Sequence, residues 1–128
     1  MRNVLALIIA NPGDLQNGLL ALSTTMPQIQ AVLLAEEADS ALRIVAAHRP
    51  ALELLDMRLP KQDVVLRQIK TEWPITLCIA LIGTVQHAQG ATVAMADARL
   101  LKGFSPSKFI DTVETLLNKP PHSVTNSS

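Results

Sequence analysis

The sequence predicts a single α/β domain in which five parallel strands alternate with helices, a (βα)5 arrangement. Short apolar runs recur along the chain at residues 4–9, 29–34, 51–55, 76–82 and 98–101. Four of these runs are almost continuously apolar, which is typical of strands buried on both faces of a parallel sheet. The intervals between them carry helical patterns, and this alternation indicates a doubly wound parallel sheet with helices on both faces.

The first two intervals have the spacing of amphipathic helices. Leu15, Leu19 and Leu22 fall on one helical face, and Asp14 is expected to cap that helix. In the second interval an i, i+3, i+4, i+7 stripe consists of Ala38, Ala41, Leu42 and Val45. Pro50 should end this second helix, because proline cannot continue it.

The last interval gives the clearest helical signal. Ser105 suits an N-cap, and Pro106 suits the first helical position after it. The apolar face of this helix consists of Phe109, Val113 and Leu116. Weaker patterns predict a third helix within residues 61–73 and a fourth over roughly residues 85–96, where Gly90 lowers the helix propensity.

The number of strands and the chain length favour one particular sheet. Five strands in 128 residues suit the flavodoxin-like strand order 2-1-3-4-5. We expect residues 1–118 to form one domain, and residues 119–128, KPPHSVTNSS, to form a flexible tail or linker. Trp73 precedes a proline in an expected loop and should cover the edge of the core.

Composition limits the classes of partner. The 11 basic and 11 acidic residues cancel, and aromatic residues make up only 2%, so neither nucleic acid nor a membrane surface is an expected partner. Cys78, the single cysteine, lies in an apolar run and should be buried and inert, which favours a reducing, cytoplasmic setting. Residues 1–14 suit a first strand better than a signal peptide.

Ligands of doubly wound sheets bind beyond the carboxyl ends of the strands, at the point where the strand order reverses. The residues that follow the strands there are Ala10, Asn11, Asp56, Gly83, Thr84 and Lys102. A carboxylate, a hydroxyl and an ammonium group are therefore expected to converge from three strands. The alternatives are a strand-end cap for Asp56, a helix N-cap for Thr84 and a solvated surface position for Lys102.

Three segments resemble the receiver domain of bacterial response regulators. They are LLDMRLP around Asp56, the Gly83–Thr84 pair after the fourth strand, and ADARLLKG, which contains Lys102. The similarity covers roughly residues 3–118. It implies that Asp56 accepts a phosphoryl group from a histidine kinase or phosphotransfer protein, while Thr84 hydrogen-bonds the phosphoryl oxygens and Lys102 pairs with them.

The same resemblance implies a signalling role rather than an enzymatic one. The expected output is a changed protein–protein surface on the fourth helix, the fifth strand and the last helix. That surface would bind a downstream effector protein or domain, and a homodimer is a further option. Phosphorylation adds a dianion that reorients nearby loops, which turns a local charge into a switch.

The sequence departs from the receiver pattern in three places. The family has an acidic pair after the first strand that holds Mg²⁺, whereas this chain has Ala10 and Asn11. The remaining metal ligands would be Asp56, the Asn11 amide oxygen and the backbone carbonyl of Arg58, so Mg²⁺ binding is expected to be weak. Arg99 replaces an aromatic residue common in the fifth strand, and the interval from Thr84 to Lys102 is short.

Two other classes of protein stay open. A pseudo-receiver would keep the fold as an interaction module that works without phosphorylation, and the Ala10–Asn11 pair favours it. A small enzyme or nucleotide-binding flavodoxin-like protein ranks lowest, because no glycine-rich phosphate loop is present. The histidines His48, His87 and His122 have no ligand spacing.

Overall fold

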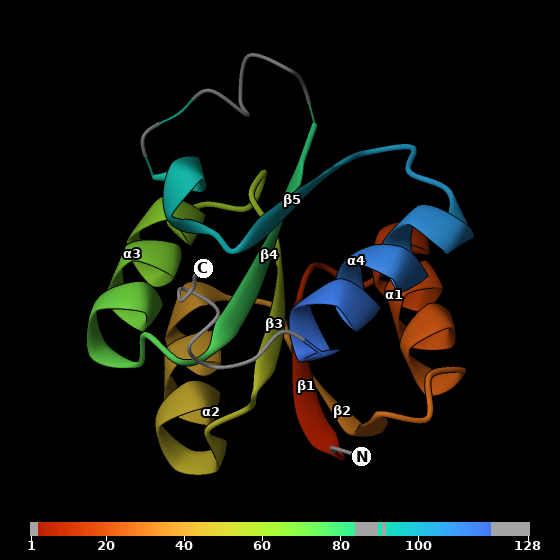
Figure 1. Cartoon of the computed structure of the whole chain (residues 1–128). Coiled ribbons are helices and arrows are strands. Elements are labelled where there is room, and N and C mark those ends of the chain that lie inside the picture. Colours follow the sequence, from red (N-terminus) through yellow and green to blue (C-terminus); the bar gives the residue numbers. More distant parts are fainter. Residues whose placement is uncertain (1–2, 84–89, 91, 119–128) are drawn as a thin grey trace, which may run out of the picture.

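The sheet confirms the predicted strand order. The computed structural model describes residues 3–83, 90 and 92–118. Its five parallel strands lie in the order β2-β1-β3-β4-β5 (Figure 1). Their bounds are β1 Val4–Ile9, β2 Ile29–Ala35, β3 Leu52–Asp56, β4 Leu77–Ile82 and β5 Ala98–Leu101. The strand order reverses between β1 and β3, so their carboxyl ends form the switch point.

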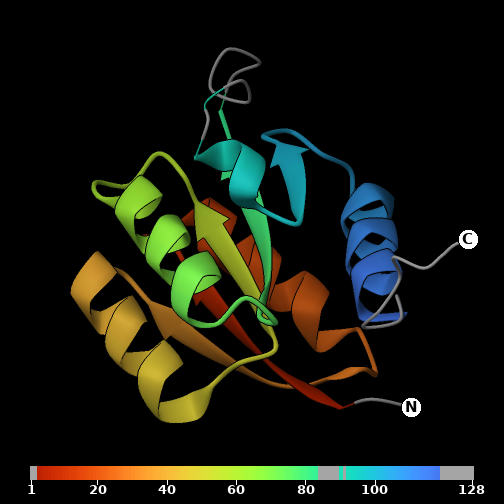
Figure 2. The same ribbon diagram turned by 60° about the vertical axis from the view of Figure 1, so that its left-hand side comes forward.

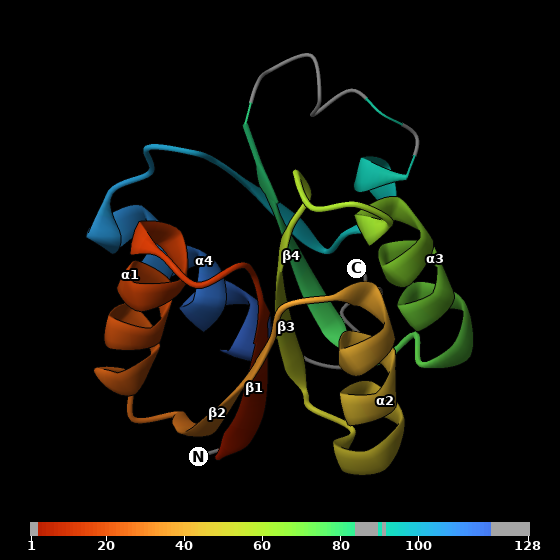
Figure 3. The same cartoon turned by 180° about the vertical axis from the view of Figure 1, so that it is seen from behind.

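Helices cover both faces of this sheet. They are α1 Asp14–Thr24, α2 Ala38–His48, α3 Gln62–Glu72 and α4 Pro106–Asn118, with a short 3₁₀ turn η2, Val93–Met95. α1 and α4 lie on one face, and α2 and α3 lie on the other (Figures 1 and 3). Figure 2 shows α2 and α3 side by side over their face. None of the helices among the described residues is long and apolar enough to cross a membrane.

The core has two halves, one on each face of the sheet. On the α1/α4 face, Leu19 and Phe109 pack against strand residues such as Leu54. On the other face, Val45 and Ile69 pack against the opposite sides of the same strands. The central strands are therefore buried on both faces, which explains why their sequences are apolar without alternation.

The predicted helix ends are confirmed at two helices and wrong at one. The Ser105 hydroxyl oxygen accepts a hydrogen bond from the Lys108 N–H at 3.1 Å and so caps α4. α2 ends at His48, before Pro50. Asp14, however, lies in the first turn of α1, and Gly13 is the N-cap with φ of 150°. Glycine accepts this positive φ, so the chain enters the helix one residue earlier than expected.

The predicted fourth helix falls mostly outside the described residues, which omit residues 84–89 and 91. In the remaining part of that interval the structure has the η2 turn.

Trp73 does cover the core edge, as predicted: it packs against the α2/α3 half of the core, and the Arg49 guanidinium lies 5.5 Å from its ring centroid. Cys78 is buried and unpaired, which was also predicted.

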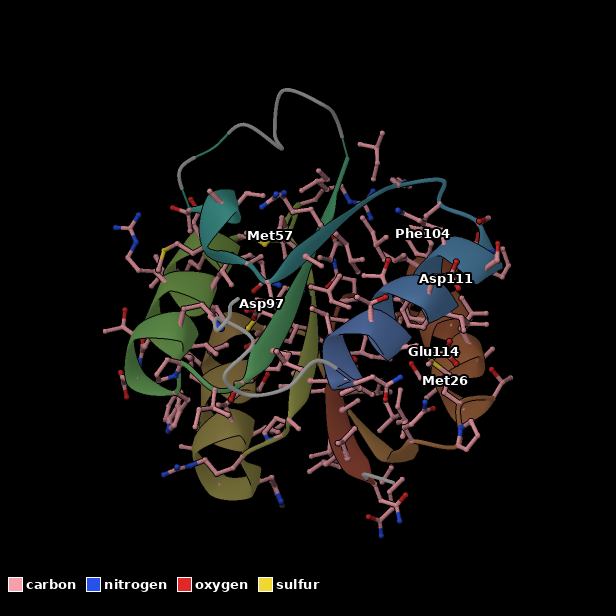
Figure 4. The ribbon with its side chains drawn as sticks, viewed as in Figure 1. Met26, Met57, Asp97, Phe104, Asp111 and Glu114 are labelled. Atoms are coloured by element: carbon pink, nitrogen blue, oxygen red, sulfur yellow. The ribbon has the colours of Figure 1, made fainter. Side chains whose placement is uncertain are left out.

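A partly exposed ion pair fixes β5 against β4 and α3. The Asp97 carboxylate accepts hydrogen bonds from the Cys78 N–H and from the Lys70 ammonium group, each at 2.8 Å. Lys70 also donates to the carbonyls of Pro74 and Thr76. In Figure 4, Asp97 lies where β5 begins beside β4. One lysine therefore connects α3 with the segments that precede two strands.

Candidate functional site

Asp56 lies at the carboxyl end of β3 and is held there by its backbone. Only 4% of the residue is exposed. Its carbonyl oxygen accepts hydrogen bonds from the Gln62 side-chain amide and from the Leu59 N–H, each at 3.1 Å. The next residue, Met57, donates its N–H to the Leu81 carbonyl of β4 at 2.9 Å. These hydrogen bonds hold the backbone at the end of β3, and so they hold the point from which the Asp56 side chain extends.

The end of β1 has a matching support. The buried Gln16 side chain of α1 donates to the Ala10 carbonyl at 3.1 Å, just as Gln62 of α3 donates to Asp56. Each glutamine comes six residues after the carbonyl that it binds. At the switch point, the buried carbonyl at each of these strand ends thus accepts a hydrogen bond from a side chain of the following helix.

The Asp56 carboxylate is bound on both oxygens by Arg58. The Arg58 Nε donates to Oδ1 and an Nη donates to Oδ2, each at 3.0 Å, and the Arg58 backbone N–H also donates to Oδ1 at 3.0 Å. Such bidentate pairing is strong and directional. The hydrogen bond to Asp56 and its negative charge raise the pKa of Arg58 above its ordinary value.

The aliphatic part of Arg58 lies against the end of β4. A Cβ added to Gly83 would lie 3.4 Å from Arg58 Cδ, which is an ordinary van der Waals contact and shows that the two residues are neighbours. Asp56 and Arg58 border a cavity of about 10 Å³ that Leu15 and Phe104 also line. A cavity of that size holds about one water molecule. A ligand larger than water therefore does not fit this cavity unless side chains that line it move.

Lys102 approaches this cavity from the end of β5. Its backbone N–H donates to the Ile82 carbonyl at 2.8 Å, and its side chain is exposed and lines the cavity with Asp56. Within residues 3–83, 90 and 92–118, the ion-pair partner of Asp56 is Arg58 rather than Lys102. The structure thus brings Lys102 to the site while Arg58 takes the direct contact.

The remaining predicted site residues follow β1 and β4. Ala10 is buried after β1, and Asn11 is exposed beside it. Thr84 lies outside the described residues, directly after Gly83. Its expected hydroxyl contact stays a prediction.

A magnesium ion does not fit the residues around Asp56 as they stand. Mg²⁺ requires near-octahedral oxygen ligands, usually including one or two carboxylates. Here both Asp56 oxygens already bind a cationic guanidinium at 3.0 Å, which repels a second cation. Ala10 offers no side-chain oxygen, and no group of three acidic, histidine or cysteine side chains able to hold a metal is found in the part of the chain described.

The sequence prediction named the backbone of Arg58 and missed its side chain. An arginine two residues after a strand-end carboxylate is near enough in the chain to fold back onto it, and that Asp-x-Arg spacing was a usable signal. Phe104 was also missed. It lines the cavity and stacks on Phe109 of α4 with ring centroids 6.1 Å apart. Figure 4 shows Phe104 on the segment between β5 and α4.

No family model and no curated protein matches the sequence. Solved structures do match the fold. The signal receiver domain of an HD domain-containing protein from Pseudomonas fluorescens superimposes with a TM-score of 0.80 at 20% identity, covering 96% of this chain and 92% of that one. A putative response regulator from Chloroflexus aurantiacus gives 0.76 at 19% identity, covering 91% and 98%.

A third match is to part of a longer protein. NtrX from Brucella abortus, solved in complex with ADP, gives a TM-score of 0.78 at 21% identity over 90% of this chain. The matched region is 26% of the NtrX chain, so this chain corresponds to about a quarter of that protein. These matches show that the chain, with its five parallel strands in the order 2-1-3-4-5, has the fold of response regulator receiver domains.

Proposed function

We propose that this chain is a receiver module of a two-component phosphorelay, in which Asp56 accepts a phosphoryl group. The observation that carries the proposal is the position of Asp56. A nearly buried carboxylate at the carboxyl end of β3 borders the same cavity as Lys102, at the switch point of a receiver fold. Ligand sites of this class of sheet occur at that point.

The chemistry requires a nucleophile and groups that neutralise charge. The Asp56 carboxylate supplies the nucleophile and forms an aspartyl phosphate. Positioning and electrostatic stabilisation supply most of the catalysis in phosphoryl transfer. Lys102 at the end of β5 pairs with the phosphoryl oxygens, and Thr84 is proposed to donate a hydrogen bond to them.

The donor is a histidine kinase or a phosphotransfer protein. Phosphorylation replaces the singly charged carboxylate with a dianion, which attracts Lys102 and shifts the segment between β5 and α4. The surface that changes is therefore the one formed by β5 and α4 with the segment before β5. A downstream effector protein or domain, or a second copy of the chain, binds that surface.

Incubation with acetyl phosphate and Mg²⁺ at pH 7 is expected to add the mass of one phosphoryl group to the intact chain. Asp56→Asn should abolish the gain, because the amide is no nucleophile. Asp63→Asn is the matched control, since Asp63 is an exposed acid in the first turn of α3 and should leave the gain unchanged. Circular dichroism checks that the variants fold. A gain that survives Asp56→Asn contradicts the assignment of Asp56.

A pseudo-receiver is the second candidate, and one observation favours it. Arg58 already binds both oxygens of the Asp56 carboxylate, so this carboxylate has a cationic partner without any phosphoryl group. Such a module would bind its effector without phosphorylation. Phosphodonor treatment would then change neither partner binding nor self-association, in the wild type or in Asp56→Asn. The wild type would also gain no mass under the conditions above.

A further inference from the structure

We propose that Arg58 is the resident cation of the Asp56 site, so that phosphoryl transfer to Asp56 proceeds without a bound divalent metal. The inference rests on the proposed phosphoacceptor function and concerns how that site neutralises charge. Its starting point is the conflict between the expected Mg²⁺ and the guanidinium that occupies both Asp56 oxygens at 3.0 Å. A metal ion bound to either of these oxygen atoms would lie beside the positively charged guanidinium, which repels it.

Arg58 has the donors that the role requires. Two of its side-chain N–H groups bind Asp56, and a guanidinium carries further N–H groups in the same plane. The side chain is 42% exposed whereas that of Asp56 is only 6% exposed, so the guanidinium lies between the carboxylate and solvent. An anion that approaches Asp56 therefore meets Arg58 first. Arginine binds phosphate oxygens in a bidentate manner as well as carboxylates.

The charges balance without a metal. Before transfer, Asp56 carries one negative charge, and Arg58 and Lys102 each carry one positive charge on the same cavity. After transfer, the aspartyl phosphate is close to a dianion. The two cations then match its charge. A divalent metal would leave an excess of positive charge beside Arg58.

The hydrogen bonds also distinguish the two carboxylate oxygens. Oδ1 accepts from both the Arg58 backbone N–H and Nε, whereas Oδ2 accepts from one Nη alone. Oδ2 therefore keeps the more accessible lone pair and is the nucleophile. Because the backbone N–H bond to Oδ1 does not depend on the guanidinium, the carboxylate stays oriented when the side chain moves.

In the transfer step, Oδ2 of Asp56 forms a bond to the phosphorus atom while the bond from phosphorus to the donor atom breaks. The electron pair of that bond leaves with the donor, which is an imidazole nitrogen that takes up a proton or the carboxylate of an acyl phosphate. The Arg58 Nη leaves Oδ2 and donates to a phosphoryl oxygen instead. The cavity of about 10 Å³ opens by this movement.

The test uses trifluoroberyllate, an anion that mimics a phosphoryl group on a carboxylate, with ¹⁹F NMR as the readout. Wild type in EDTA is expected to give a bound fluorine signal, and added Mg²⁺ should tighten binding by less than about twofold. Arg58→Ala should weaken metal-free binding by about tenfold or more, and Arg58→Lys by less, since lysine keeps the charge but loses the bidentate geometry.

Two controls accompany this test. Arg43→Ala, which removes an exposed positive charge from α2, should leave binding unchanged. Asp56→Asn should give no bound signal. A wild-type signal that appears only with Mg²⁺, or an Arg58→Ala variant that binds as well as wild type in EDTA, overturns the role of Arg58 while Asp56 keeps its own. The absence of any bound signal from folded wild type in both buffers overturns the proposed phosphoacceptor instead.

Discussion

Glu53→Met is expected to stabilise the protein, and by more at pH 8 than at pH 5. Glu53 is the second residue of β3, in register with Leu7 of β1 and Cys78 of β4, and is fully buried. Neither of its carboxyl oxygens has a hydrogen-bond partner among the described residues. A buried polar group without a partner costs about 1–3 kcal/mol. Methionine fills a similar volume and carries no such cost.

The pH dependence follows from the protonation state of Glu53. Burial raises its pKa from 4.5 to about 8, and the positive charge of Lys70 opposes part of this rise. Between these two pH values the folded chain holds a proton that the unfolded chain releases. The stability that this proton contributes is fully present below pH 4.5 and is lost as the pH rises through about 8. The expected slope is at most about 1.4 kcal/mol per pH unit.

Urea unfolding at pH 5, 6, 7 and 8 measures this effect. Wild-type stability should fall with rising pH relative to Glu53→Met, so that the gain from methionine is on the order of 3 kcal/mol larger at pH 8 than at pH 5. Glu53→Gln is the matched control. It is neutral throughout and should remove the slope while keeping an unpaired polar group. Parallel pH profiles for wild type and Glu53→Met would show that Glu53 is ionised in the folded state.

Phe109→Ala is expected to cost about 3–5 kcal/mol of unfolding free energy. Phe109 is fully buried in α4 and packs into the α1/α4 half of the core. Removing the ring leaves a cavity that the surrounding strands cannot collapse to fill. The ring also supports Phe104, which lines the Asp56 cavity. The same substitution should therefore loosen the wall of the candidate site.

Phe104→Ala is the matched control for this second prediction. Phe104 is only partly buried, so its removal should cost clearly less stability while still opening the cavity beside Asp56. Denaturant unfolding of both variants at one pH gives the comparison. Equal losses for the two phenylalanines would contradict the view that Phe109 is the core residue and Phe104 the lining of the site.

The strand pattern predicted the sheet because burial on both faces leaves a direct mark on sequence. Continuous apolar runs such as residues 4–9 and 76–82 are typical of strands buried in a parallel sheet. Five such strands in a chain of this length favoured the order 2-1-3-4-5, which the structure has. Helix ends were less certain. Asp14 suits a cap by residue type, but the positive φ of Gly13 decides where α1 begins.

The candidate site could be located from sequence, although its contacts could not. Asp56 and Lys102 were expected at one edge of the sheet, since parallel strands bring their carboxyl ends together. The direction of the Arg58 side chain could not be predicted from the pattern, because it packs beside Gly83 at the end of another strand. Glu53 was missed for a similar reason, because one carboxyl group within LELL does not disturb the apolar pattern.

Phosphorylation of Asp56 without a metal is tested most directly by the intact mass of the wild-type chain after incubation with acetyl phosphate in EDTA. The expected result is the gain of one phosphoryl group, located by peptide mapping on the segment that contains Asp56 and released by hydroxylamine, which cleaves acyl phosphates. The contradictory result is an unchanged mass in EDTA for a chain that circular dichroism shows to be folded.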